Sequence, residues 1–169
     1  MLHSILKLVD SVASIPAASA HCDIPCKIYD PGTAQIAALT VIRMMDLIEE
    51  LGAQDSLSIQ DQAQLVRLVN VKEEHGLIVK EEVRVIWGDY FKQPQFDKVP
   101  GVHDLVHKIM LQASKAKQGV NRADAVTLLE LVNQFAEAFW LTKDVPTFKA
   151  VCPYPPAEVV VYPKLDPAK

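Results

Sequence analysis

Apolar residues recur every three or four positions through most of the chain, a spacing that predicts amphipathic helices rather than strands. The first such segment should begin at Asp30-Pro31, with Asp30 as the N-cap and Pro31 at the first helical position. Gly52 should end it. Its apolar face is formed by Val41, Met44, Ile48 and Leu51.

A second helix should begin near Ser58, because Asp61 stands three residues further on and can complete a capping box. No proline interrupts this segment before Pro94, so it could extend for about thirty residues, and Gly76 is the position where it could bend. Its apolar positions are Leu65, Val66, Val69, Ile78, Val79, Val83 and Ile86.

Two further helices are expected after a loop bracketed by Pro94 and Pro100. The third should end at Gly119, and Asn121 can cap the fourth, with Asp124 in its first turn. Their apolar stripes are Val102, Leu105, Val106 and Ile109, then Ala125, Leu128, Val132, Phe135 and Phe139. Four amphipathic helices with short connections predict an all-α fold, an up-and-down four-helix bundle.

The C-terminal stretch from about residue 144 is rich in proline and cannot continue a helix. We expect an extended tail that lies over the bundle or over a partner. The run Glu158–Tyr162, "EVVVY", could add a short strand.

Composition narrows the class of protein. The chain has 169 residues, half of them hydrophobic, which is typical of one soluble globular domain. Its net charge of −4 argues against a nucleic-acid surface, and no apolar run approaches the ~20 residues needed to span a bilayer. Cys22, Cys26 and Cys152 make an odd count, which favours reduced or metal-bound thiols, and hence a cytoplasmic location, over a disulfide framework.

The first twenty residues end in Ala18-Ser19-Ala20, which matches an A-x-A cleavage signature. The rest is a poor secretory signal, because positive charge does not cluster at its start and because Lys7 and Asp10 interrupt the apolar stretch. Two interpretations remain: an ordinary amphipathic N-terminal segment, or a propeptide that a dedicated maturation protease removes before His21.

The sequence His21-Cys22-Asp23-Ile24-Pro25-Cys26 is the densest cluster of potential metal ligands. Zinc would need a fourth donor from elsewhere. A redox dithiol usually has two residues between its cysteines, whereas three separate Cys22 from Cys26. Chance proximity is a third interpretation.

A fourth interpretation depends on cleavage before His21. The new α-amine, the Cys22 amide nitrogen and the two thiolates would then offer two nitrogens and two sulfurs, a set that suits nickel(II) or copper(II) in a plane. The His21 imidazole could approach along the axis.

The pattern H-C-x-x-P-C-x-x-Y, which ends at Tyr29 and is followed by Asp30-Pro31, resembles the metal hook of nickel-containing superoxide dismutases. Two further segments resemble that family: "VIWGDYFKQPQF", residues 85–96, and "FW" at residues 139–140. The resemblance extends from His21 to about Lys143. It divides the chain into a leader or propeptide (1–20), the hook and bundle (21–143) and the tail (144–169).

The resemblance implies a four-helix bundle that assembles as a homohexamer, with superoxide as substrate and a nickel ion that alternates between the 2+ and 3+ states. By the same resemblance Cys22 and Cys26 are equatorial ligands, and His21 supplies the amine and the axial imidazole. Tyr29 and Tyr90 would flank the open face of the metal site, and Asp23 would support these residues around the ligands. A non-enzymatic nickel or copper carrier that uses the same hook is the alternative function.

The chain departs from the family at three positions. Lys27 follows the second cysteine, where glycine is common. Ala37 and His75 stand where other members have a glutamate and an arginine that orient the axial histidine. We therefore expect His75 to help hold His21, the alternative being an ordinary, partly exposed helix histidine.

Two other groupings need no chemical role. His103 and His107 are four residues apart, a spacing that can bind metal, but no third ligand is obvious and two solvated histidines are expected. Trp87 and Phe91 are expected in the core or in a subunit contact.

Overall fold

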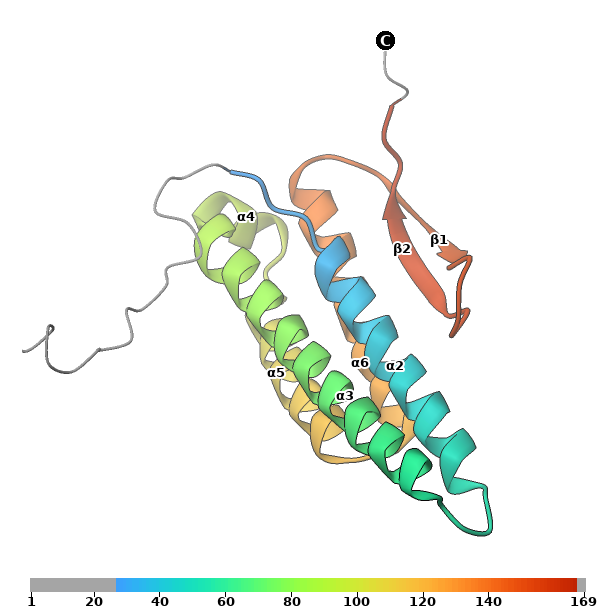
Figure 1. Ribbon diagram of the computed structural model, residues 1–169. Helices are drawn as coiled ribbons and strands as arrows, with labels where there is room; N and C mark the ends of the chain where they lie inside the picture. The colour runs from blue at the N-terminus through green and yellow to red at the C-terminus, as the bar shows by residue number, and fades with distance from the viewer. Residues whose placement is uncertain (1–26, 167–169) are drawn as a thin grey trace, which may run out of the picture.

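Four long helices dominate the computed structural model, which describes residues 27–166. They are α2 (Gly32–Gly52), α3 (Ile59–Val85), α5 (Val102–Gln118) and α6 (Arg122–Thr142). Consecutive long helices run in opposite directions and pack side by side (Figure 1). The predicted all-α bundle is therefore confirmed. Within the described residues, no helix combines the length and the apolarity needed to cross a membrane.

Local capping residues set the ends of α2 and α3. The helix α2 ends at Gly52 as predicted, but its start was predicted one residue too early: Pro31 is the N-cap, without a side-chain cap, and Gly32 is the first helical residue. The Asp30 Oδ1 atom still accepts the backbone N–H of Gly32 at 2.7 Å. Ser58 and Asp61 form the complete reciprocal capping box, in which each side chain accepts the other residue's backbone N–H. A capping interaction of this kind satisfies helix N–H groups that otherwise lack a partner.

The helix α3 runs without interruption through Gly76 and continues into a π-helical turn, η1 (Ile86–Tyr90). At Gly76 a Cβ atom would lie 2.4 Å from Lys117 Cγ. The glycine therefore lets the Lys117 side chain cross close to α3. The position that the sequence marks as a bend is a place of close packing between α3 and α5.

The segment between Pro94 and Pro100, expected as a loop, contains the short helix α4 (Gln93–Lys98). Pro94 lies in its first turn, where a missing N–H costs nothing. The Gln95 Oε1 atom accepts the Lys92 backbone N–H at 3.1 Å and fixes the start of this turn. The prolines therefore bracket a helical turn rather than an irregular loop.

The core fills the space between the four long helices. Its largest fully buried apolar side chains are Phe91, Phe135, Phe139, Ile42, Met45, Ile86, Ile109 and Leu128. Tyr29 and Tyr90 pack against this core from its edge. The expectation that Phe91 belongs to the core is confirmed, and Trp87 is half-buried beside it.

The C-terminal segment folds back as an antiparallel hairpin of β1 (Thr147–Val151) and β2 (Val159–Pro163), with Thr147 opposite Pro163. Figure 1 shows the hairpin beside α2 and α6. Val160 and Val161 are buried. The run "EVVVY" thus supplies a strand, and the tail lies over the bundle of its own chain, as hydrogen-bonded strands rather than as a loose extended arm.

Two helix side chains replace a third strand along the edge of β2. Asn133 on α6 donates from Nδ2 to the Val159 carbonyl at 2.9 Å and accepts the Val161 N–H at 3.1 Å. Gln35 on α2 donates from Nε2 to the Val161 carbonyl at 2.9 Å and to Asn133 Oδ1 at 3.0 Å. The backbone groups of this buried edge are therefore satisfied by side chains.

Lys72 is a buried cation that joins α3 to the end of α5. Its side chain is 2% exposed, and Nζ donates to the carbonyl oxygens of Ala116, Lys117 and Gly119. Three ammonium donors thus meet three acceptors where the helix dipole is negative. Burial lowers the pKa of Lys72, and this lowering is opposed by the nearby negative charge of Glu73.

Replacement of Lys72 by methionine is expected to lower the free energy of unfolding by about 2–4 kcal/mol, because it leaves carbonyl oxygens at the end of α5 without donors. Lys80→Met is the matched control. Lys80 lies on the same helix, is half-buried and donates one hydrogen bond, to Ser114 Oγ at 2.8 Å, so a loss of about 1 kcal/mol is expected. Urea titration measures both, and equal losses would contradict the role given to Lys72.

Candidate functional site

Four of the predicted site residues, His21, Cys22, Asp23 and Cys26, lie outside the described residues. The described chain begins at Lys27, directly after the second cysteine. Three residue steps join Cys26 to Tyr29, which limits the distance between their Cα atoms to about 11 Å. The surroundings of Tyr29 therefore define the end of the bundle to which the hook is tethered.

Lys27 has a φ of 60°, in the left-handed region that glycine adopts most readily. Glycine is the residue expected here from the family resemblance. The chain thus keeps the backbone conformation of a glycine at this position while it carries a lysine side chain, which is exposed. A non-glycine residue in this region costs about 1 kcal/mol or more.

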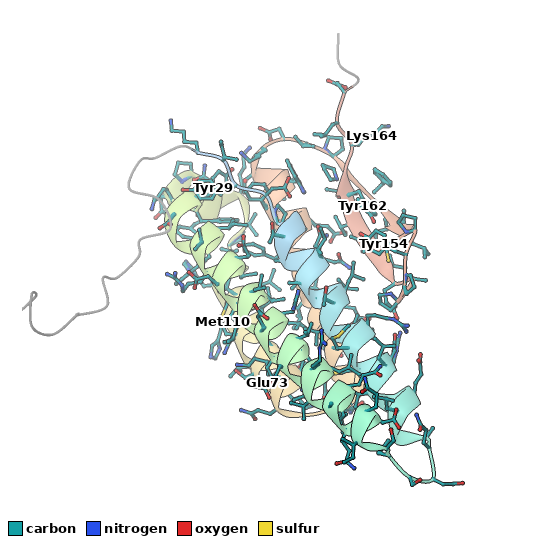
Figure 2. The ribbon with its side chains drawn as sticks, in the orientation of Figure 1. Tyr29, Glu73, Met110, Tyr154, Tyr162 and Lys164 are labelled. Atoms are coloured by element: carbon teal, nitrogen blue, oxygen red, sulfur yellow. The ribbon has the colours of Figure 1, made fainter. Side chains whose placement is uncertain are left out.

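Tyr29 and Tyr90 meet although 61 positions separate them in the sequence. Their ring centroids lie 5.7 Å apart with an interplanar angle of 49°. Tyr29 precedes α2, and Tyr90 is the last residue of η1. Both side chains are half-buried, and Figure 2 shows Tyr29 at the end of the bundle beside α4. The two tyrosines that the sequence assigned to one site are therefore brought together.

The Tyr90 ring is held by aromatic neighbours and one hydrogen bond. Its centroid lies 4.9 Å from that of Phe139 and 5.4 Å from that of Phe91. The Thr142 hydroxyl lies 2.6 Å from the Phe139 carbonyl oxygen, which can only accept, so Thr142 donates there. The Tyr90 hydroxyl, 2.7 Å from Thr142 Oγ1, must then donate to Thr142. Its proton points toward α6.

Lys143, at the end of α6, lies over the rings of Tyr90 and Phe139. Its Nζ atom lies 4.8 Å from the Tyr90 ring centroid and 5.1 Å from that of Phe139, which is within cation–π range. The side chain is exposed and forms no ion pair with any described residue. The adjacent Asp144 is paired with Lys98 at 2.7 Å. Lys143 thus places a positive charge on the Tyr90 side of the tyrosine pair.

Thr142 and Lys143 are site residues that were not predicted from the sequence. The available signal was the "FW" motif: Thr142 and Lys143 follow Phe139 by three and four positions, which places them on the same face of a helix, one turn further on. A helix that presents Phe139 to Tyr90 therefore also presents these two residues to it.

His75 and Ala37 lie away from the tyrosine pair within this chain. Ala37 is buried in the core of α2. His75 is half-buried, and its Nδ1–H donates to the Val71 carbonyl at 2.8 Å. Ten residues of helix, about 15 Å, separate it from the start of η1. Figure 2 shows Glu73, two residues before it, well along α3 from Tyr29. The contact between His75 and His21 stays a prediction.

His103 and His107 are both exposed, as expected. His103 nevertheless has partners: its Nδ1 atom accepts from the Trp87 indole N–H at 3.0 Å. Among residues 27–166, no three His, Cys, Asp or Glu side chains come together in a way that could hold a metal ion. The predicted ligands at residues 21–26 lie outside the part of the chain that the structure describes.

A helical bundle that follows directly on the His21–Cys26 sequence cluster is the arrangement expected of a metal-binding protein. Residues 16–143 match the family model described as nickel-containing superoxide dismutase. Two relatives, each named superoxide dismutase [Ni], come from Streptomyces seoulensis and Streptomyces coelicolor. Each is 36% identical over 125 residues, 74% of this chain and 89% of the relative.

Solved structures give the same result. A native structure of nickel superoxide dismutase is 35% identical and has a TM-score of 0.62, with 73% of this chain and 99% of that chain covered. A structure with nickel ligation of the oxidized state is 34% identical, with a TM-score of 0.63 and the same coverage. The chain therefore belongs to the nickel-containing superoxide dismutase family, oxidoreductases whose cofactor is nickel. The matched region stops before the hairpin.

Proposed function

We propose that this chain converts two superoxide ions and two protons to oxygen and hydrogen peroxide at a nickel ion held by His21, Cys22 and Cys26. Cleavage between Ala20 and His21 by a maturation protease precedes activity. The family match over residues 16–143, which includes all of these positions, carries the proposal. The tyrosine pair that follows the hook supports it, since two rings from distant parts of the chain meet next to the tethered segment.

The donor set fits nickel. Cys22 and Cys26 supply soft thiolates, and a chain that begins at His21 supplies its α-amine and the Cys22 amide nitrogen, with the imidazole as a fifth donor. Bound nickel supplies one-electron chemistry, because strong thiolate and amide donors make the 3+ state accessible. Asp23, inside the hook, is proposed to support this arrangement. His75 is proposed to contact His21, in place of the arginine seen in other members.

Tyr29 and Tyr90 are proposed to form the wall past which superoxide, hydrogen peroxide and water move. The Tyr90 hydroxyl is already a donor to Thr142, so its oxygen presents lone pairs rather than a proton to an entering molecule. Lys143 lies over the Tyr90 ring, where its positive charge attracts the superoxide anion toward a site on a protein of net charge −4. The proposed wall therefore combines the fixed Tyr90 ring with the positive charge of Lys143.

Replacement of Tyr90 by phenylalanine is expected to change kcat/KM by about two- to tenfold, the equivalent of one hydrogen bond, without loss of nickel. The ring contacts with Phe139 and Phe91 remain, so the fold is kept. Stopped-flow superoxide decay and metal analysis check both parts. Tyr154→Phe, in the hairpin, is the control and should leave both unchanged. Nickel loss from the Tyr90 variant would contradict its assignment to the wall.

The proposed function is tested by superoxide decay with nickel-loaded protein that begins at His21. The same protein loaded with zinc is the control, because zinc has no redox chemistry. Nickel-dependent acceleration far above the zinc control supports the enzyme. If nickel binds but superoxide decays at the background rate, the chain is a metal carrier and the proposal is wrong. Homohexameric assembly and a cytoplasmic location stay predictions from the sequence.

A further inference from the structure

His103 forms a specific side-chain contact that has no part in the proposed mechanism. The Trp87 Nε1–H donates to its Nδ1 atom at 3.0 Å. The two rings meet edge to face, with centroids 5.8 Å apart and an interplanar angle of 90°. The ring of Phe96, from α4, lies 4.5 Å from the imidazole centroid at 33°. One imidazole on α5 thus joins η1 and α4.

This hydrogen bond requires His103 to be uncharged. An indole N–H can only donate, so Nδ1 must accept and the proton of the neutral ring must be on Nε2. A charged imidazolium carries N–H groups at both positions and cannot accept. Protonation of His103 therefore removes the hydrogen bond to Trp87.

Trp87 matters because it belongs to the turn that presents Tyr90. Both lie in the five-residue π-helical turn η1, which is closed by the Phe91 N–H donating to the Ile86 carbonyl at 3.3 Å. A π-turn is rare and frequently lies at a functional site. Side-chain anchors on such a turn decide where its last residue points.

We propose that His103 is a positioning residue: as an uncharged acceptor it holds the Trp87 indole and thereby the turn that carries Tyr90. The inference rests on the proposed function only for the consequence, which is that superoxide turnover depends on this turn. The contact between Trp87 and His103 can be measured without nickel, because neither residue is a proposed ligand.

The charged groups on the packed elements do not pair with His103. On η1 and just after it these are Asp89 and Lys92, on α4 they are Asp97 and Lys98, and on α5 they are Asp104, His107 and Lys108. Three are engaged elsewhere: Lys92 donates to the Gly88 carbonyl, Asp97 accepts from Gln93, and Lys98 pairs with Asp144. Within residues 27–166, His103 forms no ion pair.

The contact is tested in the full-length, metal-free protein by NMR of the indole N–H groups. The chain has two tryptophans, so Trp140 serves as an internal reference. On acidification the Trp87 indole signal should shift together with the His103 ring signals, while the Trp140 signal stays fixed. A Trp87 signal that does not follow the His103 titration overturns the proposal.

Three variants distinguish the effect of the His103 hydrogen bond on the turn from the effect of its side-chain size. His103→Gln offers a side-chain acceptor that does not titrate, so the pH-dependent shift should vanish while the turn stays closed. His103→Ala should speed hydrogen exchange of the Phe91 amide, which closes the turn, by about three- to tenfold. His107→Gln, an exposed neighbour on the same helix, should change neither quantity. Phe91 exchange equal to that of the original protein in His103→Ala overturns the proposal.

The link to turnover is read from the nickel-loaded protein that begins at His21. Its kcat/KM should fall as His103 becomes protonated, and His103→Gln should remove that acid limb while keeping the rate at pH 8. An unchanged pH profile in His103→Gln overturns the positioning role. If the loaded protein is inactive altogether, the proposed function fails, and the indole and exchange measurements still decide whether His103 holds the turn.

Discussion

Protein that retains residues 1–20 is expected to accelerate superoxide decay at least roughly 100-fold less than protein that begins at His21, under identical nickel supply. In the uncut chain the His21 nitrogen is part of the peptide bond to Ala20, so the amine donor does not exist. Loss of a mere partner of a metal ligand typically costs 10–100-fold in affinity or activity, and loss of a ligand should cost more. Stopped-flow decay and bound nickel are measured on both forms.

The matched control is protein that begins at Ala20. One extra residue blocks the His21 amine in the same way as the whole leader, but adds almost no bulk. We expect it to be as inactive as the uncut form, because the missing donor rather than steric cover is the cause. Full activity of this one-residue extension would show that the amine is not a ligand and that the leader acts in another way.

Several helix ends were predictable because their determinants are local, although α2 begins one residue later than expected. The Ser58–Asp61 capping box, the Asn121 cap and the stops at Gly52 and Gly119 each involve residues within one helical turn. Periodicity then identifies the buried face of each helix. The bundle follows, since amphipathic helices with short connections have few other ways to bury their apolar stripes.

The hairpin could not be derived in the same way. Its position depends on Gln35 and Asn133, two polar residues on helices whose buried partners are backbone atoms of β2, up to 126 positions away. The sequence does not indicate which segment a polar residue on an apolar helix face will bind. Lys72 is similar: a lysine is expected in solvent, and only the end of α5 explains its burial.

The residues of the candidate site also differ in how far the sequence could predict them. Tyr29 and Tyr90 were found through motif resemblance, which supplies long-range information that periodicity lacks. Thr142 and Lys143 were missed because their roles exist only once α6 lies against Tyr90. The α-amine of His21 is a further case, since no residue letter encodes it and only cleavage creates it.

Replacement of either Cys22 or Cys26 by serine is expected to weaken nickel binding by roughly 100-fold or more. A serine hydroxyl keeps the size of the side chain but is a hard, protonated donor at neutral pH, whereas the thiolate is soft and charged. The loss should therefore appear in affinity as well as in turnover. Equilibrium dialysis of protein that begins at His21, together with the sulfur-to-nickel absorption bands, measures it.

Cys152→Ser is the matched control for these variants. Cys152 is the free, buried thiol of the hairpin segment, and its Sγ atom donates to the Tyr154 carbonyl at 3.2 Å, a bond that a serine hydroxyl can also make. Nickel affinity should therefore be unchanged in this variant. If Cys22→Ser or Cys26→Ser binds nickel as tightly as Cys152→Ser does, the thiolates are not ligands. The metal would then be held without sulfur ligands, and the resemblance to the family hook would not extend to its chemistry.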